Sequence, residues 1–182
     1  NLETESGISI MKIGENLDTG PLCNSYKIKI TNKDTAESLS EKLSSLAAEK
    51  ILENIDNILE GSVEFVEQDH SKATYASKIE KAEGQINWNE SAESIVGKIN
   101  GLNPNPGAFF VYNGERYKIL KAEVTSKEGN AGEVLENYLD IACGDKKSIK
   151  VLEIQRQGKR PQNIGEFIPG SQIKKGSKLN NA

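Results

Sequence analysis

The sequence predicts an α/β unit followed by a small OB-like β-barrel. Residues 8–59 contain two apolar strand-like runs and one long amphipathic stretch, a combination typical of α/β domains. Residues 108–154 contain five short strand-like runs with glycine-bearing turns among them, which is typical of small barrels. A polar stretch lies between these two regions, and so we expect two modules.

The two strands of the first module are predicted from hydrophobic patterning. Residues 8–13 (ISIMKI) are an almost continuous apolar run, and residues 22–30 (LCNSYKIKI) end in an alternation of polar and apolar side chains. Both patterns predict strands. Residues 14–21 (GENLDTGP) contain two glycines and a proline, which predicts a turn between the strands.

A long helix should follow the second strand. Asp34 and Glu37 have the spacing of a capping box at a helix N-terminus. Apolar residues recur at spacings of three and four from Leu39 to Leu59, which predicts an amphipathic helix, and Gly61 should follow its end as the C′ residue. Because two strands and a helix cannot bury a core alone, we expect this module to be the last unit of a larger α/β domain.

The second module follows a polar stretch at residues 66–85, which is interpreted as a linker. A short helix capped by Asn89 or Ser91 should end before the prolines of residues 103–107 (NPNPG). An Asn-Gly pair at residues 113–114 predicts a hairpin. The strand-like runs are residues 108–112, 116–124, 132–136, 138–143 and 148–154.

Charge is distributed unevenly along the chain. The formal net charge is −4, yet residues 1–74 carry −7 and residues 146–182 carry +7. An acidic first part and a basic end indicate two modules. The basic end is either a solvated surface or a face that binds phosphate groups, since clustered Lys and Arg supply the salt-dependent part of nucleic-acid affinity.

Several classes of protein and site are disfavoured by what the sequence lacks. No apolar stretch approaches the roughly 18 residues that a membrane helix needs, and the first residues do not have the apolar segment of a signal peptide. The sequence contains no P-loop, no GxGxxG motif and no cluster of metal ligands, and its single histidine, His70, lies in the polar linker. The two cysteines, Cys23 and Cys143, are expected to be reduced thiols.

Asp18 is the carboxylate best placed for chemistry. It lies in the turn after the first strand of the α/β unit, and such strand ends are where these folds place ligands. Leu17 beside it is expected to pack inward, and Gly14 and Gly20 let the backbone approach a ligand closely. Asp18 is therefore either a turn residue that caps its own backbone, or a proton acceptor or orienter of a histidine.

Residues 6–22 (SGISIMKIGENLDTGPL) resemble the LDTG or LDxG turn region of the folate-dependent formyltransferases, most closely that of the methionyl-tRNA formyltransferases. Other segments resemble this family in the same order along the chain. They are residues 34–43 (DTAESLSEKL), 71–79 (SKATYASKI), 86–95 (INWNESAESI), 103–109 (NPNPGAF), 158–160 (GKR) and 170–179 (GSQIKKGSKL). The ordered set makes the resemblance specific.

The resemblance implies a division of the chain. Residues 1–68 would be the C-terminal part of a Rossmann-like catalytic domain, residues 69–87 a linker, and residues 88–182 an OB-like domain that binds tRNA. An earlier part of the family's catalytic domain carries a catalytic Asn, a catalytic His and an SLLP motif. This sequence does not contain that part, and His70 is not at the position of the catalytic His. The resemblance thus predicts an enzyme of which these 182 residues are a fragment without activity of its own.

The implied reaction transfers a formyl group from 10-formyltetrahydrofolate to the α-amino group of methionyl-initiator tRNA. Asp18 matches the family's catalytic Asp, which would keep the His protonated and help to take the proton from the amine. The resemblance also implies no metal, a monomer and a cytoplasmic location of the bacterial type. The folate pocket would be lined by Ile13, Gly14, Glu15, Asn16 and Leu17, and RNA would be bound by Lys78, Lys81, Lys159 and Arg160.

The sequence departs from the family at Asn105, where Trp is usual, and at Pro161, where a more flexible residue is usual. A sugar-nucleotide formyltransferase, which shares the catalytic fold, is an alternative, although such an enzyme does not need a phosphate-seeking basic end. A glycinamide ribonucleotide formyltransferase is disfavoured because it would end soon after Gly61. A stand-alone RNA-binding module is the alternative from a different class.

Overall fold

The computed structural model describes residues 1–179 and divides the chain into two compact units, each of which is described by itself. The first, here called the hairpin unit, comprises Glu3–Thr31 and Ser38–Lys78. The second, called the sheet unit, comprises Asn1–Leu2, Asn32–Glu37 and the chain from Ile79 onward. No helix within the described residues is long and apolar enough to cross a membrane.

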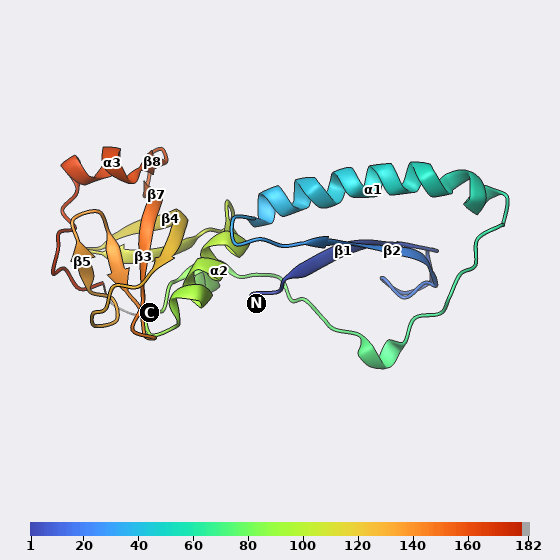
Figure 1. Ribbon diagram of the computed structural model, residues 1–182, viewed down its shortest axis with the longest axis horizontal. Helices are drawn as coiled ribbons and strands as arrows, with labels where there is room; N and C mark the ends of the chain where they lie inside the picture. The colour runs from blue at the N-terminus through green and yellow to red at the C-terminus, as the bar shows by residue number, and fades with distance from the viewer. Residues whose placement is uncertain (180–182) are drawn as a thin grey trace. The chain divides into compact units, whose positions relative to one another are not determined.

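The hairpin unit consists of an antiparallel strand pair and a long helix. Strands β1 (Glu5–Met11) and β2 (Leu22–Lys29) pair with each other, and helix α1 (Ala36–Leu59) runs alongside them (Figure 1). The predicted order of strand, turn, strand and helix is confirmed. β1 begins earlier than the apolar run at residues 8–13 indicates, because backbone pairing continues as far as Glu5 opposite Lys29.

Helix α1 ends in a Schellman motif at Gly61, as the sequence predicts. The backbone N–H of Gly61 donates to the carbonyl oxygen of Ile58 at 3.2 Å, and that of Ser62 donates to Asn57 at 3.0 Å. Gly61 has a φ of 72°, and no atom lies within 4 Å of the position that a Cβ would take. The glycine therefore meets a requirement of the backbone and none of packing.

Polar side chains link α1 to β2. The amide of Asn24 donates to Asn54 Oδ1 at 2.8 Å, and the amide of Asn54 donates to Tyr26 Oη at 2.8 Å. The ammonium of Lys50 lies 5.5 Å from the centroid of the Tyr26 ring. No residue of α1 is fully buried among the described residues, as expected for a unit with so little apolar area to cover.

The sheet unit combines a six-stranded antiparallel sheet with helix α2 (Ala92–Leu102). The strand order is β3-β4-β7-β6-β5, with β8 paired to β7. A short helix α3 (Ile164–Phe167) follows β8 (Figure 1). The strands are β3 (Ala108–Tyr112), β4 (Glu115–Thr125), β5 (Val134–Glu136), β6 (Asp140–Ala142), β7 (Ser148–Arg156) and β8 (Gln162–Asn163).

Two local predictions for the sheet unit are confirmed. Ser91 caps α2, because its hydroxyl oxygen accepts a hydrogen bond from the backbone N–H of Ser94 at 3.1 Å. Asn113 and Gly114 form the turn between β3 and β4 with φ values of 50° and 78°. Positive φ at both positions is what a type I′ hairpin turn requires.

The OB-like barrel that the sequence predicts is not confirmed, because the described strands do not form a closed barrel. β3 and β5 are the ends of the strand order and do not pair with each other within the described residues. The edge of β5 is covered by a later segment, because Val134 N–H donates to Ser177 at 2.9 Å and Gly176 N–H donates to Val134 at 2.7 Å. Ser177 Oγ lies 3.2 Å from Tyr112 Oη on β3. The late segment therefore takes the backbone positions that a β3–β5 ladder would use.

The buried core belongs to the sheet unit. Trp88 is completely buried and meets Phe110 edge-on at 5.9 Å, and Phe110 stacks on Tyr117 of β4 at 5.4 Å, both distances being between ring centroids. Ile119, the next inward residue of β4, is also buried. Because side chains alternate along a strand, this core directs the intervening residues of β4 outward.

Candidate functional site

The loop between β1 and β2, residues 12–21, carries Asp18. Asp18 has a φ of 55°, in the left-handed region that Asp and Asn occupy more often than other non-glycine residues. Its side chain is exposed, and within residues 1–179 the carboxylate makes no hydrogen bond or ion pair. It therefore does not cap the turn, and it is accessible to a group that approaches the loop.

Backbone contacts close this β1–β2 loop at its base. The N–H of Lys12 donates to the carbonyl oxygen of Pro21 at 3.0 Å. Gly20 is required here, because a Cβ at this position would lie 1.7 Å from the carbonyl oxygen of Lys12. Leu22 and Val66 then exchange backbone hydrogen bonds of 2.8 and 2.9 Å, so the segment that follows α1 runs beside the start of β2.

Gln68 ties the loop to that later segment. Its side-chain nitrogen Nε2 donates to the carbonyl oxygens of Asp18, at 2.9 Å, and Gly20, at 2.7 Å. Gln68 lies in the stretch interpreted from the sequence as a linker. No local pattern could indicate this contact, because Gln68 is separated from its partners by 50 and 48 residues.

The loop presents its apolar side chains outward. Ile13 is 96% exposed and Leu17 is 93% exposed. The expectation that Leu17 packs inward is therefore wrong, and the reason is that the loop projects beyond the strand pair where no other described residue covers it. Glu15 and Asn16 are exposed as well, so residues 13–17 form an accessible, partly apolar surface next to Asp18.

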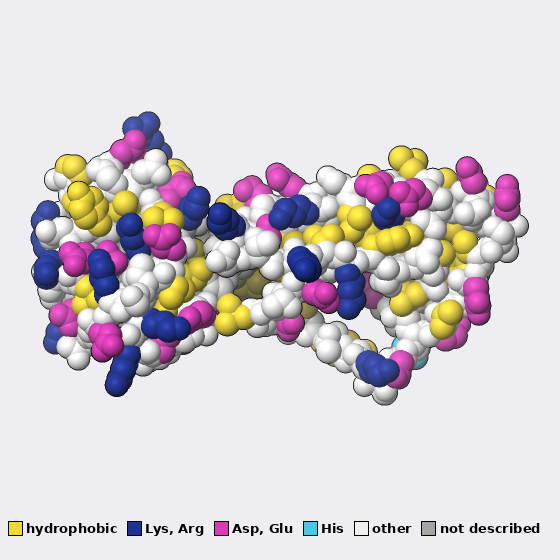
Figure 2. All heavy atoms as spheres, viewed as in Figure 1, with side chains coloured by type: hydrophobic (Ala, Val, Ile, Leu, Met, Phe, Trp, Pro, Cys, Tyr) yellow, Lys and Arg dark blue, Asp and Glu magenta, His cyan; other side chains and the backbone are white. Residues whose placement is uncertain are grey.

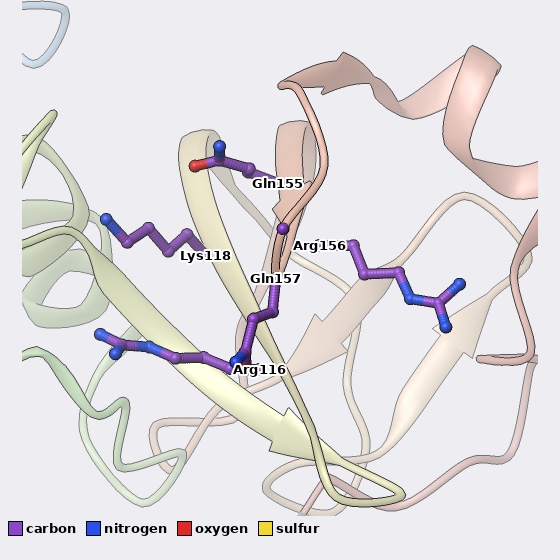
Figure 3. A pocket seen from close by; sticks show the side chains of 6 residues that line it. Arg116, Lys118, Gln155, Arg156 and Gln157 are labelled. Carbon is purple, nitrogen blue, oxygen red and sulfur yellow. The ribbon is translucent and has the colours of Figure 1, made fainter.

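A basic face lies on the sheet unit and consists of Lys81, Arg116 and Lys118. Arg116 and Lys118 are two residues apart on β4 and extend in the same direction, whereas Arg156 of β7 points away from them (Figure 3). Burial lowers the pKa of Lys118, and the positive charges of Arg116 and Lys81 lower it further. Arg116 and Lys81 are thus each close enough to Lys118 to repel its charge.

Packing holds two of these cations in place. The guanidinium carbon of Arg116 lies 3.6 Å from the centroid of the Phe109 ring, a cation–π contact. The stem of Lys118 crosses Gly107, where a Cβ would lie 2.9 Å from Lys118 Cδ. Neither Arg116 nor Lys118 has an ion-pair partner within the described residues, and Arg116 Nε is buried there without a hydrogen bond. The face therefore offers positive charge that the described chain does not neutralise.

Lys159 and Arg160 lie just beyond the end of β7, after a turn in which Gly158 has a φ of 71°. The N–H of Lys159 donates to the carbonyl oxygen of Arg156 at 3.0 Å. Both side chains are exposed and border a shallow hollow together with Arg156, which also borders the hollow at Arg116 and Lys118. The structure thus places Lys159 and Arg160 at a second hollow, which shares Arg156 with the hollow at Arg116 and Lys118.

The net charge of +7 over residues 146–182 overstates what an anionic partner would meet. Part of this charge is neutralised within the sheet unit, while the basic face draws its cations from outside that range. In the hairpin unit, acidic side chains lie along α1 (Figure 2). Lys78, also in the hairpin unit, is exposed. The neutralised cations are paired as Lys147 with Glu93, Lys150 with Glu123, and Arg156 with Glu115.

Two residues of the basic face were not singled out by the sequence analysis. The alternation of polar and apolar residues in Arg116–Leu120 (RYKIL) contained the signal, because it places Arg116 and Lys118 on one side of a strand. The alternation could not show that Lys81 comes near Lys118.

Among residues 1–179, no group of three or more His, Cys, Asp or Glu side chains could hold a metal ion.

Two family models match this chain. Residues 2–55 match the model described as formyl transferase, and residues 78–172 match the model described as formyl transferase, C-terminal domain. The chain belongs to the formyl transferase family. Asp18 and the β1–β2 loop lie within the first matched region, and the basic face lies within the second.

Among curated relatives, this formyl transferase is 65% identical over 181 residues to the methionyl-tRNA formyltransferase of Pelagibacter ubique (strain HTCC1062). The match covers 100% of this chain and 58% of that protein. It is also 40% identical over 178 residues to the methionyl-tRNA formyltransferase of Rickettsia prowazekii (strain Madrid E), covering 95% of this chain and 57% of that one. The chain therefore spans somewhat more than half the length of these relatives.

A solved structure of an N-formyltransferase from Helicobacter canadensis, in complex with folinic acid and dTDP-3-aminofucose, has the same fold. It matches this formyl transferase with a TM-score of 0.68 and 26% identity, over 82% of this chain and 56% of that one. The similarity shows a shared fold, and the fold does not by itself decide the substrate.

Proposed function

We propose that this formyl transferase takes part in the transfer of a formyl group from 10-formyltetrahydrofolate to the α-amino group of methionyl-initiator tRNA. The 65% identity to a relative named methionyl-tRNA formyltransferase carries the proposal. Because the chain spans 58% of that relative, the proposal concerns the reaction to which this chain contributes the β1–β2 loop and the basic face.

The chemistry requires a proton acceptor beside the reacting amine. The amine nitrogen attacks the formyl carbon, a tetrahedral oxyanion forms, and the bond from that carbon to the folate nitrogen then breaks. The amine gives up a proton along the way, and the departing folate nitrogen takes one up. We assign this proton to Asp18, acting directly or through a histidine that it orients, because its carboxylate is exposed and not engaged elsewhere in the described chain.

We assign the folate co-substrate to the loop residues that precede Asp18. The exposed side chains of Ile13 and Leu17 would gain from burial against a flat heteroaromatic ring. Gly14 leaves its backbone open to close approach, because the nearest atom to a Cβ there would be Thr19 Oγ1 at 3.4 Å. Glu15 and Asn16 complete the assigned segment.

We assign RNA binding to the cations of the sheet unit and to Lys78. Cations without counter-ions suit the phosphate oxygens of a nucleic acid, and an arginine held against an aromatic ring is ordered before the phosphate arrives. A bound phosphate would also relieve the repulsion among Lys81, Arg116 and Lys118. The complete set is Lys78, Lys81, Lys159 and Arg160, extended here by Arg116 and Lys118.

The remaining assignments follow from the same function. We propose that residues 1–68 serve the catalytic domain, residues 69–87 the connection, and residues 88–182 the binding of tRNA. A tRNA substrate places the reaction in the bacterial cytoplasm. We propose further that the enzyme acts as a monomer and needs no metal, because formyl transfer to an amine requires proton transfer and oxyanion stabilisation only.

A chimera tests the function. It joins this chain to the part of the Pelagibacter ubique relative that the chain does not match. We expect it to formylate methionyl-initiator tRNA with 10-formyltetrahydrofolate, and to leave a dTDP-linked amino sugar unmodified. Transfer to the sugar and not to the tRNA would identify a sugar-nucleotide formyltransferase. A folded chimera that binds tRNA and transfers no formyl group to either would support a role in RNA binding alone.

A further inference from the structure

We propose that Gln68 is a positioning residue for Asp18, and that its side-chain amide fixes the backbone from which the Asp18 carboxylate projects. The inference rests on the proposed catalytic role of Asp18 and adds to it a second residue from a distant part of the chain. Gln68 would act through Asp18, without touching the substrate.

The geometry of the contact is that of a two-pronged clamp. One amide nitrogen reaches two carbonyl oxygens, at 2.9 Å for Asp18 and 2.7 Å for Gly20. An amide nitrogen carries two N–H donors, and so each carbonyl receives one hydrogen bond. If the side-chain amide of Gln68 were flipped, its oxygen would face the two carbonyl oxygens, and no hydrogen bond could form. These two hydrogen bonds therefore determine which side of the amide carries the nitrogen.

The clamp acts on the left-handed part of the loop. Asp18 has a φ of 55°, a conformation that Asp and Asn adopt more readily than other non-glycine residues but that competes with extended and helical ones. A fixed carbonyl oxygen sets the peptide plane between Asp18 and Thr19, and with it the ψ of Asp18. Because Cβ is attached rigidly to the backbone, the clamp also sets the direction in which the carboxylate leaves it.

The segment that carries Gln68 is itself anchored to the strand pair. Val66, two residues earlier, shares two backbone hydrogen bonds with Leu22. The ring of Phe65 lies 4.2 Å from the ammonium of Lys12, at the start of the loop. Gln68 is half-buried. The amide is thus held from outside the loop, as a positioning group must be.

The test removes the donors of Gln68 and keeps its length. Gln68→Met should lower kcat for formylation by the chimera at least about tenfold, while the KM for methionyl-initiator tRNA changes less than about twofold. The matched control is Gln172→Met, at an exposed glutamine of the sheet unit, which should change neither constant. A kcat for Gln68→Met equal to that of the control would overturn the inference.

A double variant separates positioning from a general structural role. If Gln68 acts through Asp18, Gln68→Met should cause no further loss of kcat in an Asp18→Asn background. If the double variant instead loses kcat by the product of the two single losses, Gln68 acts independently of Asp18. That result would overturn the inference about Gln68 and leave the catalytic assignment of Asp18 in place. An unchanged kcat in Asp18→Asn itself would overturn the catalytic assignment of Asp18, and the inference with it, so the two failures are distinguishable.

Hydrogen exchange in the 182-residue chain provides a readout that does not depend on activity. Both Gln68→Met and Gln68→Glu should speed the exchange of amides in residues 12–21, because neither side chain has a donor for the two carbonyls at neutral pH. Amides of β4 and β7 should exchange as before. Unchanged exchange in the loop of both variants would contradict the clamp.

Discussion

Asp18 combines a left-handed backbone with an exposed carboxylate, and asparagine is one of the few residues that tolerates the same backbone. Asp18→Asn should therefore preserve the loop and remove only the proton acceptor. In the chimera we expect kcat to fall by about 100-fold or more, while tRNA affinity stays nearly constant. Steady-state kinetics and a binding titration measure the two effects, and an unchanged kcat would refute the catalytic role.

Cys143 shows how burial governs a residue outside the site. The side chain is 2% exposed, and burial raises the pKa of the thiol to about 12, with the negative charge of Asp145 adding to the effect. In the unfolded chain the thiol ionises near its ordinary value of 9.0. Between these two values the unfolded state loses a proton that the folded state keeps, so stability should fall as the pH rises.

Cys143→Ala removes this dependence. Above pH 9, the free energy of unfolding of the wild type should decline relative to that of the variant by up to about 1.4 kcal/mol per pH unit. Urea denaturation at pH 8 and pH 10, followed by the fluorescence of Trp88 in the sheet unit, measures the difference. If the free energy of unfolding depends on pH in the same way for both proteins, the Cys143 thiol has the same pKa in the folded and the unfolded state.

Glycines at the two longer helices have different roles. Gly61 follows the end of α1 and Gly101 lies within α2, and substitution by alanine should change stability in opposite directions at these two positions. Gly61→Ala forces a φ of 72° on a residue with a Cβ, which should destabilise α1 by about 1 kcal/mol. Gly101 lies inside α2 with no atom within 4 Å of a Cβ. Gly101→Ala should stabilise α2 by about 0.5–1 kcal/mol.

Hydrogen exchange of the α1 and α2 amides reports each helix separately. Slower exchange in α1 of Gly61→Ala would contradict the Schellman assignment, and faster exchange in α2 of Gly101→Ala would show that the open space beside this glycine is needed. The pair also controls for general effects of alanine, since the substitution is the same.

Local rules were sufficient for most elements. The capping spacing of Ser91, the Asn-Gly pair at residues 113–114 and the C′ glycine after α1 each act within a few residues, and each is confirmed. The closed barrel failed because closure depends on contacts between distant segments. The edge of β5 is bonded to residues 176 and 177, and no pattern within β5 could indicate that partner.

Over the whole molecule, opposite charges are separated along the chain, and the basic face should make RNA binding depend on salt. We expect the 182-residue chain to bind methionyl-initiator tRNA with an affinity that falls as salt rises. Arg116→Met and Lys118→Met should each reduce the slope of log affinity against log salt by about 1. Titrations at several salt concentrations measure these slopes.

Lys150→Met is the matched control for this experiment. Lys150 lies on β7 of the same sheet and is already paired with Glu123 at 3.7 Å, so its removal should change the slope less. Lys118→Met should also leave thermal stability unchanged or raise it, because it relieves repulsion within the basic face. Equal slopes for the wild type and the Lys118 variant would contradict the assignment of this face to RNA.

The sequence by itself determined the order of elements, the ends of α2, the C-terminus of α1 and the turns, because these depend on backbone preferences and periodicity over short stretches. It made Asp18 a candidate through its place after a strand and through the resemblance to a family. The tertiary structure alone decided that Gln68 reaches the Asp18 loop, that Lys81 comes near enough to Lys118 to lower the pKa of its ammonium, and that a late segment covers β5. These are contacts between residues far apart in the chain. Only folding brings such residues together, and composition or spacing does not reveal them.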